Sequence, residues 1–297
     1  MTLPFKKPAD RPRRLKLLLS GSAGVGKTTA AIQMPRPAVI DTEAGSVHYG
    51  DLIEKAGGGV FATTDATEII NVVRQLMSEP HDYLTLVVDP ITTVYNMALD
   101  EAARKVGTEF GRHYNEANTL FKRLCNLLQS IDMNVVITAH EKDAFETQTN
   151  AKGETERVAA GQTFDGYKKL DYIFDLWLSL SRKEKRVAGS PRIATVEKTR
   201  LAEFPDRDRF EWSYDELVKR VGLDVLTGKA TTHQLAAAEQ VTRFKSLYGR
   251  LTADEVKALK IDKALKGYDD PADLPAEKID KAIGFMQQHV DGNPAAA

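Results

Sequence analysis

Apolar and polar positions follow two alternating patterns along the first two hundred residues. Short apolar runs predict buried strands at 15–19, 38–43, 60–63, 83–89, 134–139, 175–180 and 192–197. Apolar residues three and four positions apart predict core-facing helices at 66–78 and 114–131. Strands that alternate with helices are typical of the α/β class, in which ligands bind where the strands end.

The pattern changes near residue 230, after which the spacing is only helical. The helices are expected at 234–248, 252–260 and 276–289. The first residues carry several prolines and basic side chains, which favour an extended arm. We therefore expect a basic arm at 1–14, an α/β core at 15–226 and a small helical domain at 230–297.

One internal segment fits neither pattern. Residues 141–164 include few apolar side chains and several Thr, Gln, Asn and Gly. This composition predicts a long mobile loop, and long loops inside compact domains tend to be functional.

Composition limits the class of protein. The chain has 297 residues, a net charge of −1 and one cysteine, Cys125, so a disulfide framework is excluded and a reducing compartment is indicated. No apolar run approaches the length of a membrane span, and the N-terminus lacks an apolar signal-peptide core, which predicts a cytoplasmic protein without membrane contact. Residues 1–16 are basic and residues 251–291 are acidic, which suggests two kinds of partner.

The clearest motif lies between the first apolar run and a short helical stretch ended by Pro35. It has the Walker A form Gly-x-x-x-x-Gly-Lys-Thr and, with the next residue, comprises Gly21, Ser22, Ala23, Gly24, Val25, Gly26, Lys27, Thr28 and Thr29. Glycines let a loop wrap a polyphosphate with its N–H groups pointing inward. Lys27 would bridge the β and γ phosphates, and Thr28 would bind Mg²⁺.

A second motif indicates how hydrolysis would be assisted. Asp89 ends a buried apolar run, the Walker B form in which a carboxylate holds Mg²⁺. A guanine-reading Asn-Lys-x-Asp is absent, which argues for ATP rather than GTP. Pro90 follows Asp89 directly, so a catalytic carboxylate must come from elsewhere. Glu43, at the end of another predicted strand, is the best candidate for orienting water.

Together with a polar residue after the 134–139 strand and a late Lys-x-Arg, these motifs resemble those of the RecA-like ATPases over roughly residues 12–210. The resemblance implies a P-loop core with a mostly parallel sheet flanked by helices, and ATP hydrolysis in a ring or filament. It implies that Glu43 activates water and that His140 senses the γ phosphate. Lys198 and Arg200 would reach the site of a neighbouring subunit and stabilise the transferring phosphoryl group.

The run from Met34 to Glu43 is more narrowly similar to phage-encoded RecA-like single-strand annealing proteins. This resemblance implies binding of single-stranded DNA and recombination helped by a single-strand-binding protein. Structural alternatives stay open for the same residues. Glu43 could cap a turn, His140 could be a structural histidine, and Lys198 and Arg200 could be solvated charges.

DNA contact requires cations for the backbone and aromatic rings for the bases. In and after the expected mobile loop, the cations are Lys142, Lys152, Arg157, Lys168 and Lys169, interleaved with Phe145, Phe164 and Tyr167. Arg112 marks a second candidate segment.

The sequence thus predicts an ATPase that forms homo-oligomers and binds single-stranded DNA for annealing or homologous recombination. Two alternatives remain open: a DnaB-like or packaging-related DNA translocase, and an ATP-dependent regulator or scaffold without DNA binding. The C-terminal helical region could dock a single-strand-binding protein, pack on the core or regulate DNA access through its negative charge.

Overall fold

The computed structural model describes residues 13–149, 155–184, 187–232 and 234–292, so most of the predicted basic arm and Lys152 lie outside the described residues. The chain divides into two compact units. The sheet unit comprises the described residues of 1–66, 82–118 and 132–230, and the helical unit comprises those of 67–81, 119–131 and 231–297.

The sheet unit is built on a mostly parallel sheet. Among the described residues the sheet has eight strands in the order β10-β9-β8-β1-β5-β4-β2-β3, and neighbouring strands are parallel except in the pairs β8–β9 and β9–β10. The strands are β1 Lys16–Gly21, β2 Pro37–Asp41, β3 Gly59–Ala62, β4 Thr85–Asp89, β5 Asn134–Ala139, β8 Leu176–Arg182, β9 Arg192–Thr199 and β10 Arg209–Glu211. The predicted α/β fold with a mostly parallel sheet is confirmed.

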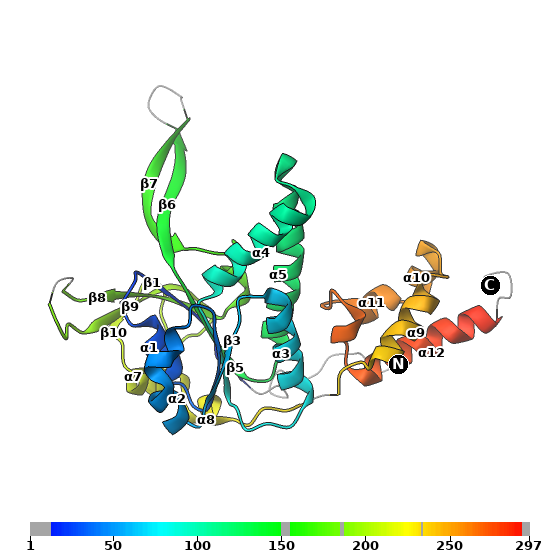
Figure 1. Cartoon of the computed structure of the whole chain (residues 1–297), viewed down its shortest axis with the longest axis horizontal. Helices are drawn as coiled ribbons and strands as arrows, with labels where there is room; N and C mark the ends of the chain where they lie inside the picture. Colours follow the sequence, from blue (N-terminus) through cyan, green and yellow to red (C-terminus); the bar gives the residue numbers. More distant parts are fainter. Residues whose placement is uncertain (1–12, 150–154, 185–186, 233, 293–297) are drawn as a thin grey trace. The chain divides into compact units, whose positions relative to one another are not determined.

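Burial on both faces explains why the central strands appear as apolar runs. Every residue of β1 and β5 is buried. One face packs on α1, α2, α7 and α8, and α4 lies on the other (Figure 1). The helices of this unit are α1 Lys27–Ile32, α2 Gly50–Lys55, α4 Ile91–Val106, α6 Leu170–Ile173, α7 Tyr214–Val221 and α8 Leu223–Thr227, with 3-10 turns at Gly45–Tyr49 and Glu109–Gly111. The long helix α5, Arg112–Ser130, begins in the sheet unit and continues into the helical unit.

The prediction of a mobile loop at 141–164 is wrong, because this segment forms an antiparallel hairpin. Its strands are β6 Glu141–Thr149 and β7 Thr155–Phe164, and the hairpin projects from the sheet unit (Figure 1). Most of its side chains are exposed, so the backbone ladder forms without the apolar alternation by which strands are recognised. Its base is anchored where the buried Phe164 meets Trp177 edge to face, with ring centroids 5.1 Å apart.

The helical unit has its own apolar core. The unit comprises α3 Ala66–Ser78 from residue 67 onward, the second half of α5, α9 Ala238–Tyr248, α10 Ala253–Ala258, α11 Ile261–Leu265 and α12 Ala276–Gly292, with a 3-10 turn at Pro271–Asp273. Phe244, Leu247, Ile279, Ile283 and Met286 form the centre of this core. None of the helices within the described residues is long and apolar enough to span a membrane.

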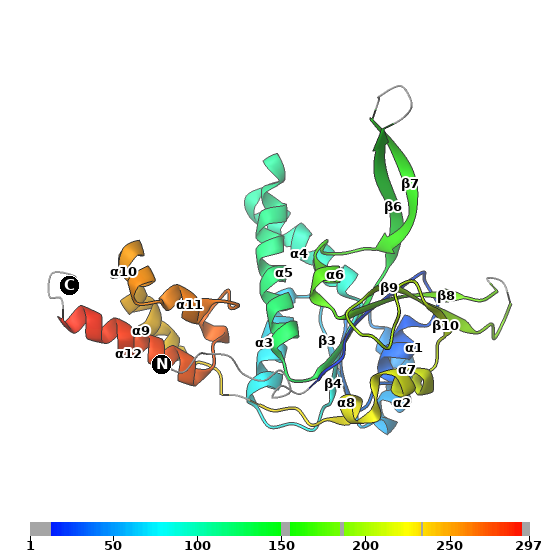
Figure 2. The same cartoon turned by 180° about the vertical axis from the view of Figure 1, so that it is seen from behind.

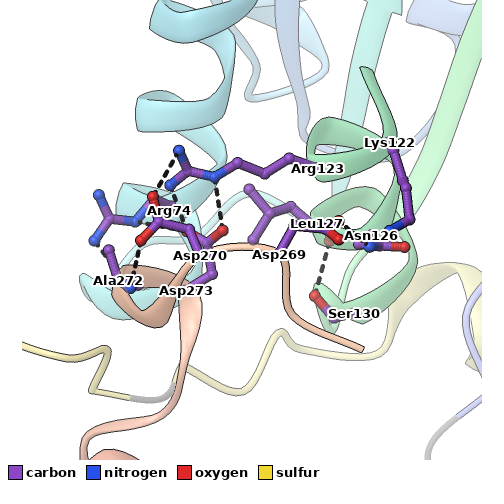
Figure 3. A network of polar contacts seen from close by, with 10 residues as sticks. All are labelled: Arg74, Lys122, Arg123, Asn126, Leu127, Ser130, Asp269, Asp270, Ala272 and Asp273. Atoms are coloured by element: carbon purple, nitrogen blue, oxygen red, sulfur yellow. Dashed lines mark hydrogen bonds and ion pairs between the residues drawn. The ribbon is translucent and has the colours of Figure 1, made fainter. Parts of the chain in front are cut away.

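A polar network ties the 269–273 segment to α3 and α5 (Figure 3). Asp273 is 2% exposed and accepts hydrogen bonds from Arg123 Nε and Nη2 at 2.8 and 2.9 Å. Arg74 Nε lies 3.3 Å from Asp273 Oδ1, and its Nη2 donates to the Ala272 carbonyl at 3.0 Å. Asp269 pairs with Lys122 at 2.7 Å near the surface. The acidic segment is therefore held by cations from α3 and α5.

Candidate functional site

The glycine-rich loop joins β1 to α1 at the carboxyl edge of the sheet. Gly24 and Gly26 have φ values of 69° and 103°, the left-handed region that favours glycine. A Cβ at Gly26 would also lie 3.4 Å from Arg192 Nε. The loop conformation thus depends on the glycine positions of the motif.

Lys27 lies buried inside this loop. Its Nζ donates to the carbonyl oxygens of Gly21 and Ser22 at 2.6 and 3.1 Å. Burial lowers the pKa of Lys27, whereas the carboxylates of Asp89, Glu141 and Glu43 act in the opposite direction. An incompletely compensated cation within a loop of this shape suits a polyphosphate anion.

Asp89 lies at the end of β4, next to β2 and β5. Thr138 on β5 donates a hydrogen bond to Asp89 Oδ1, which fixes the carboxylate. The described residues contain no cluster of three or more His, Cys, Asp or Glu side chains that would hold a metal by themselves. Mg²⁺ is usually bound by one or two carboxylates together with substrate phosphates, so the pair predicted here, Thr28 and Asp89, suits Mg²⁺ that arrives with a nucleotide.

Glu43 and His140, predicted from separate strands, lie together. His140 Nε2 is 3.5 Å from Glu43 Oε1, and Thr93 Oγ1 donates to the same oxygen at 2.7 Å. The two side chains are 46% and 43% exposed, so water and substrate can reach them. The catalytic and sensor roles of this pair stay predictions.

A different carboxylate caps the turn after β2. Asp41 accepts hydrogen bonds from the backbone N–H groups of Glu43, Gly45 and Ser46 at 3.1, 3.2 and 2.8 Å. Burial alone would raise the pKa of Asp41, but these hydrogen bonds outweigh burial and lower the pKa. Because Asp41 satisfies the turn, the Glu43 carboxylate is left for other partners.

Glu141 is a carboxylate near the site that the sequence prediction omitted. Its Oε1 accepts hydrogen bonds from Ser179 Oγ at 2.8 Å and Ser20 Oγ at 3.4 Å. Its charge also acts on the pKa of Lys27. The available signal was its place directly after His140 at the end of a buried strand.

Two arginines that were not predicted also contact the glycine-rich loop. Arg182 Nη2 donates to the Gly24 carbonyl at 2.9 Å, and Arg192 Nε donates to the Val25 carbonyl at 2.6 Å. They come from the end of β8 and the start of the antiparallel β9, which are paired with each other. Strand register, rather than any local motif, brings them to the loop.

Lys198 and Arg200 lie at the opposite edge of the sheet, because β9 runs away from the loop. Lys198 donates to the Phe174 carbonyl, and Arg200 donates to Asp175 Oδ1 at 3.2 Å and to the Tyr172 carbonyl at 2.7 Å. Burial and the nearby Arg200 lower the pKa of Lys198. The structure does not bring either cation to the loop of the same chain, and contact with a neighbouring subunit stays a prediction.

The predicted DNA-contact residues lie on three separate segments: the hairpin, the residues after it, and the start of α5. On the hairpin, the Arg157 guanidinium lies 4.4 Å from the ring centroid of the exposed Phe145, and Lys142 pairs with Asp165 at 2.7 Å. Lys168 and Lys169 are exposed after the hairpin, Arg112 is exposed at the start of α5, and Lys152 lies outside the described residues.

The prediction that Phe164 and Tyr167 are available to stack on bases is wrong, because both rings are buried. Phe164 and Tyr167 are 7% and 6% exposed. Phe164 packs on Trp177, and the Tyr167 ring centroid lies 6.0 Å from that of Tyr95. Their apolar bulk anchors the base of the hairpin, so of the three predicted rings only Phe145 is available to a base.

Comparison with known proteins agrees with this geometry. The family model described as the AAA domain matches residues 13–210, which is more than half of the chain and includes the glycine-rich loop, Asp89 and the hairpin. No curated protein matches the chain. With its P-loop ATPase-type domain, the chain belongs to the AAA domain family.

Proposed function

We propose that this protein hydrolyses ATP, assembles with copies of itself and binds single-stranded DNA for annealing or homologous recombination. The observation that carries the proposal is that two adjacent threonines bind the two parts: Thr93 donates to Glu43, and Thr92 is hydrogen-bonded to His140 and Asp165 at the base of the β6–β7 hairpin. This arrangement would make the rate of hydrolysis depend on what the hairpin binds.

The nucleotide step uses residues already close to one another. Lys27 would exchange its two carbonyl partners for β and γ phosphate oxygens, and Thr28 and Asp89 would hold Mg²⁺. The metal ion would neutralise charge that develops on the phosphate oxygens. Thr93 and His140 both contact Oε1 of Glu43, so Oε2 can orient a water molecule toward the γ phosphate.

The connection to the hairpin runs through Thr92, the residue before Thr93. Thr92 Oγ1 accepts from the His140 N–H at 2.9 Å and donates to the Asp165 carbonyl at 2.6 Å. The Asp165 N–H donates to the His140 carbonyl at 2.7 Å, which closes the base of the hairpin. A ligand that displaces the base of the hairpin would thus also displace Thr93 and His140, the two residues that contact Glu43.

The hairpin offers the chemistry that a single strand requires. Arg157 can meet a phosphate, and the exposed Phe145 ring can stack on a base. The joint between α4 and α5, where Arg112 lies, points to the same side as the hairpin in both views (Figures 1 and 2). A strand that lies across this side would meet cations from both elements.

Assembly is supported by the cations at the other edge of the sheet. Lys198 has a lowered pKa, which indicates a cation with incomplete anionic compensation within its own chain. In a ring or filament, this edge of one copy would face the nucleotide of the next. Lys198 and Arg200 would then stabilise the phosphoryl group during transfer.

Phosphate release from ATP, measured with and without an oligothymidylate, tests the proposal. We expect wild type to be stimulated several-fold by DNA, and Arg157→Ala to lose that stimulation while keeping its basal rate. Lys219→Ala is the matched control, because it removes an exposed cation, on α7, away from the hairpin. A wild-type rate that is indifferent to DNA would contradict the proposal.

Measurements of unwinding, assembly and DNA affinity separate the alternatives. Stimulation accompanied by directional unwinding of a duplex would favour a translocase over an annealing protein. An assembly that requires ATP, is lost in Lys27→Ala and has no affinity for DNA at low salt would favour a regulator or scaffold. Lys198→Ala should lose DNA-stimulated hydrolysis if hydrolysis depends on assembly.

A further inference from the structure

A cavity of about 620 Å³ lies in the helical unit, where α9 meets α12. Its lining comes from one face of α9, from Arg250 just after that helix and from Gln287 of α12. All the lining residues belong to the helical unit, so the cavity is no part of the candidate nucleotide site. The volume falls within the range of roughly 300–1,000 Å³ that is common for binding sites.

The spacing of residues along α9 determines which side chains face this cavity. Glu239, Arg243, Ser246 and Arg250 are four, three and four positions apart, so they follow one another along one side of the helix. The turn after the helix keeps Arg250 in line, because its N–H donates to the Leu247 carbonyl at 3.1 Å. Leu247 belongs to the apolar core of the unit and supplies an apolar part of the floor.

The two arginines of the cavity are exposed and have no carboxylate partner among the described residues. Arg123 of the same unit, by contrast, pairs with the buried Asp273 at 2.8 Å. Between the two arginines lies the Ser246 hydroxyl, which likewise has no hydrogen-bond partner in the described part of the chain. Three hydrogen-bond donors, two of them positively charged, therefore stand in a row without an acceptor.

The lining favours an acidic peptide over a nucleic acid. Guanidinium and hydroxyl groups bind carboxylates and phosphates alike, but a single strand also needs aromatic rings on which its bases stack. None of the described residues that line the cavity is aromatic. Leu247 and Ala238 instead offer apolar surface to an apolar side chain. Glu239, at the start of α9, repels carboxylates there and directs them toward Arg243 and Arg250.

We infer that this cavity binds a segment of a partner protein in which carboxylates adjoin an apolar side chain. The carboxylates would meet Arg243, Ser246 and Arg250, and the apolar side chain would cover Leu247. The inference goes beyond the proposed function and does not depend on it, because none of these residues belongs to the nucleotide site or to the hairpin.

Fluorescence anisotropy of a labelled peptide tests the inference. The probe is Ser-Asp-Asp-Leu-Phe-Asp-Asp-Ser, and two matched probes carry Asn in place of every Asp or Ser in place of Leu and Phe. We expect wild type to bind the first probe at least about tenfold more tightly than either matched probe. Equal binding of the three probes, or no binding of the first, would overturn the inference.

Substitutions in the chain locate the binding. Arg243→Gln and Arg250→Gln should each weaken binding of the first probe about tenfold. Lys245→Gln is the matched control, because Lys245 is exposed on the same helix but does not line the cavity, and its Kd should stay within about twofold of wild type. A loss in the control as large as in the arginine variants would place the peptide elsewhere and overturn the inference.

An oligothymidylate provides the remaining comparison. Its binding should not change in Arg243→Gln or Arg250→Gln, and a loss of its binding in both variants would assign the arginines to nucleic acid and overturn the inference. The three peptides are also compared on wild type alone, so the test does not depend on the folding of a variant. A chain that binds the peptide but neither hydrolyses ATP nor binds DNA would contradict only the proposed function.

Discussion

Two largely buried cations, one in each unit, are treated differently by their surroundings. Lys27 in the glycine-rich loop donates only to carbonyl oxygens at close range, and burial lowers its pKa. Arg123 in the helical unit has Asp273 and Asp270 as ion-pair partners, and the hydrogen bond to Asp273 raises its pKa (Figure 3). The first cation is prepared for an anion that arrives with a ligand, and the second is already neutralised. Incomplete compensation thus indicates a ligand site, and complete compensation indicates a structural one.

Removal of the Lys27 ammonium group should give the largest effect, on the rate of ATP hydrolysis. Lys27→Ala is expected to lower the rate of ATP hydrolysis about 1,000-fold, or ~4 kcal/mol in the barrier, because charge on the transferring phosphoryl group loses its nearest cation. The melting temperature without nucleotide should stay the same or rise slightly, since a desolvated charge is removed. Phosphate release and thermal unfolding measure the two effects, and a large fall in melting temperature would show that Lys27 is structural.

For the ion-pair network around Asp273 we expect a loss of stability with no change in hydrolysis. Asp273→Asn removes the charge that faces Arg123 and Arg74, and should lower the free energy of local opening by about 3 kcal/mol without changing hydrolysis. Hydrogen exchange of the amides around the Pro271–Asp273 turn measures this opening.

Asp269→Asn is the matched control, because its partner Lys122 is 63% exposed. Exposed pairs contribute about 0–1 kcal/mol, so the exchange of the same amides should change little. Equal effects of the two substitutions would mean that burial does not decide the strength of this network.

The burial of an element decides whether the sequence predicts it. Strands buried on both faces, such as β1 and β5, appear in the sequence as apolar runs. The helix α4 received no prediction because alanine and threonine make up much of its buried face, and the hairpin was mistaken for a loop because its ladder needs no core.

The residues of the candidate site also fall into two groups, those that the sequence predicts and those that it does not. Lys27 and Asp89 belong to motifs that are local in the sequence, so they could be named without a structure. Arg182 and Arg192 reach the loop through the register of β8 with β9, and Glu141 reaches Ser20 through the order of the strands. Distances set by pairing between distant strands have no local pattern that predicts them.

Lys16 tests whether incomplete charge compensation always indicates a ligand site, because it is an incompletely compensated cation outside the candidate site. Burial lowers its pKa to about 7, and its Nζ donates to the Met133 carbonyl at 2.9 Å. The folded chain releases this proton near pH 7 and the unfolded chain only near pH 10.5, so stability should rise as pH increases between these values. From pH 6 to pH 8.5 the gain should be about 1–2 kcal/mol in urea unfolding, and Lys16→Met should lack it. A gain that persists in the variant would assign it to other groups.

Cys125 should give the smallest effect, because a neutral buried group needs no partner at all. Burial raises the pKa of its thiol from 9.0 to about 12. The unfolded chain ionises first, so stability from this group is complete well below pH 9 and is lost as pH rises through 9 toward 12. At pH 9 the loss should be only about 0.4 kcal/mol relative to pH 7, measured as the difference between wild type and Cys125→Ala. The sensitive measurement is therefore reactivity: a thiol reagent at pH 8 should label Cys125 only after the helical unit opens, at a rate that Asp273→Asn increases and Lys27→Ala does not.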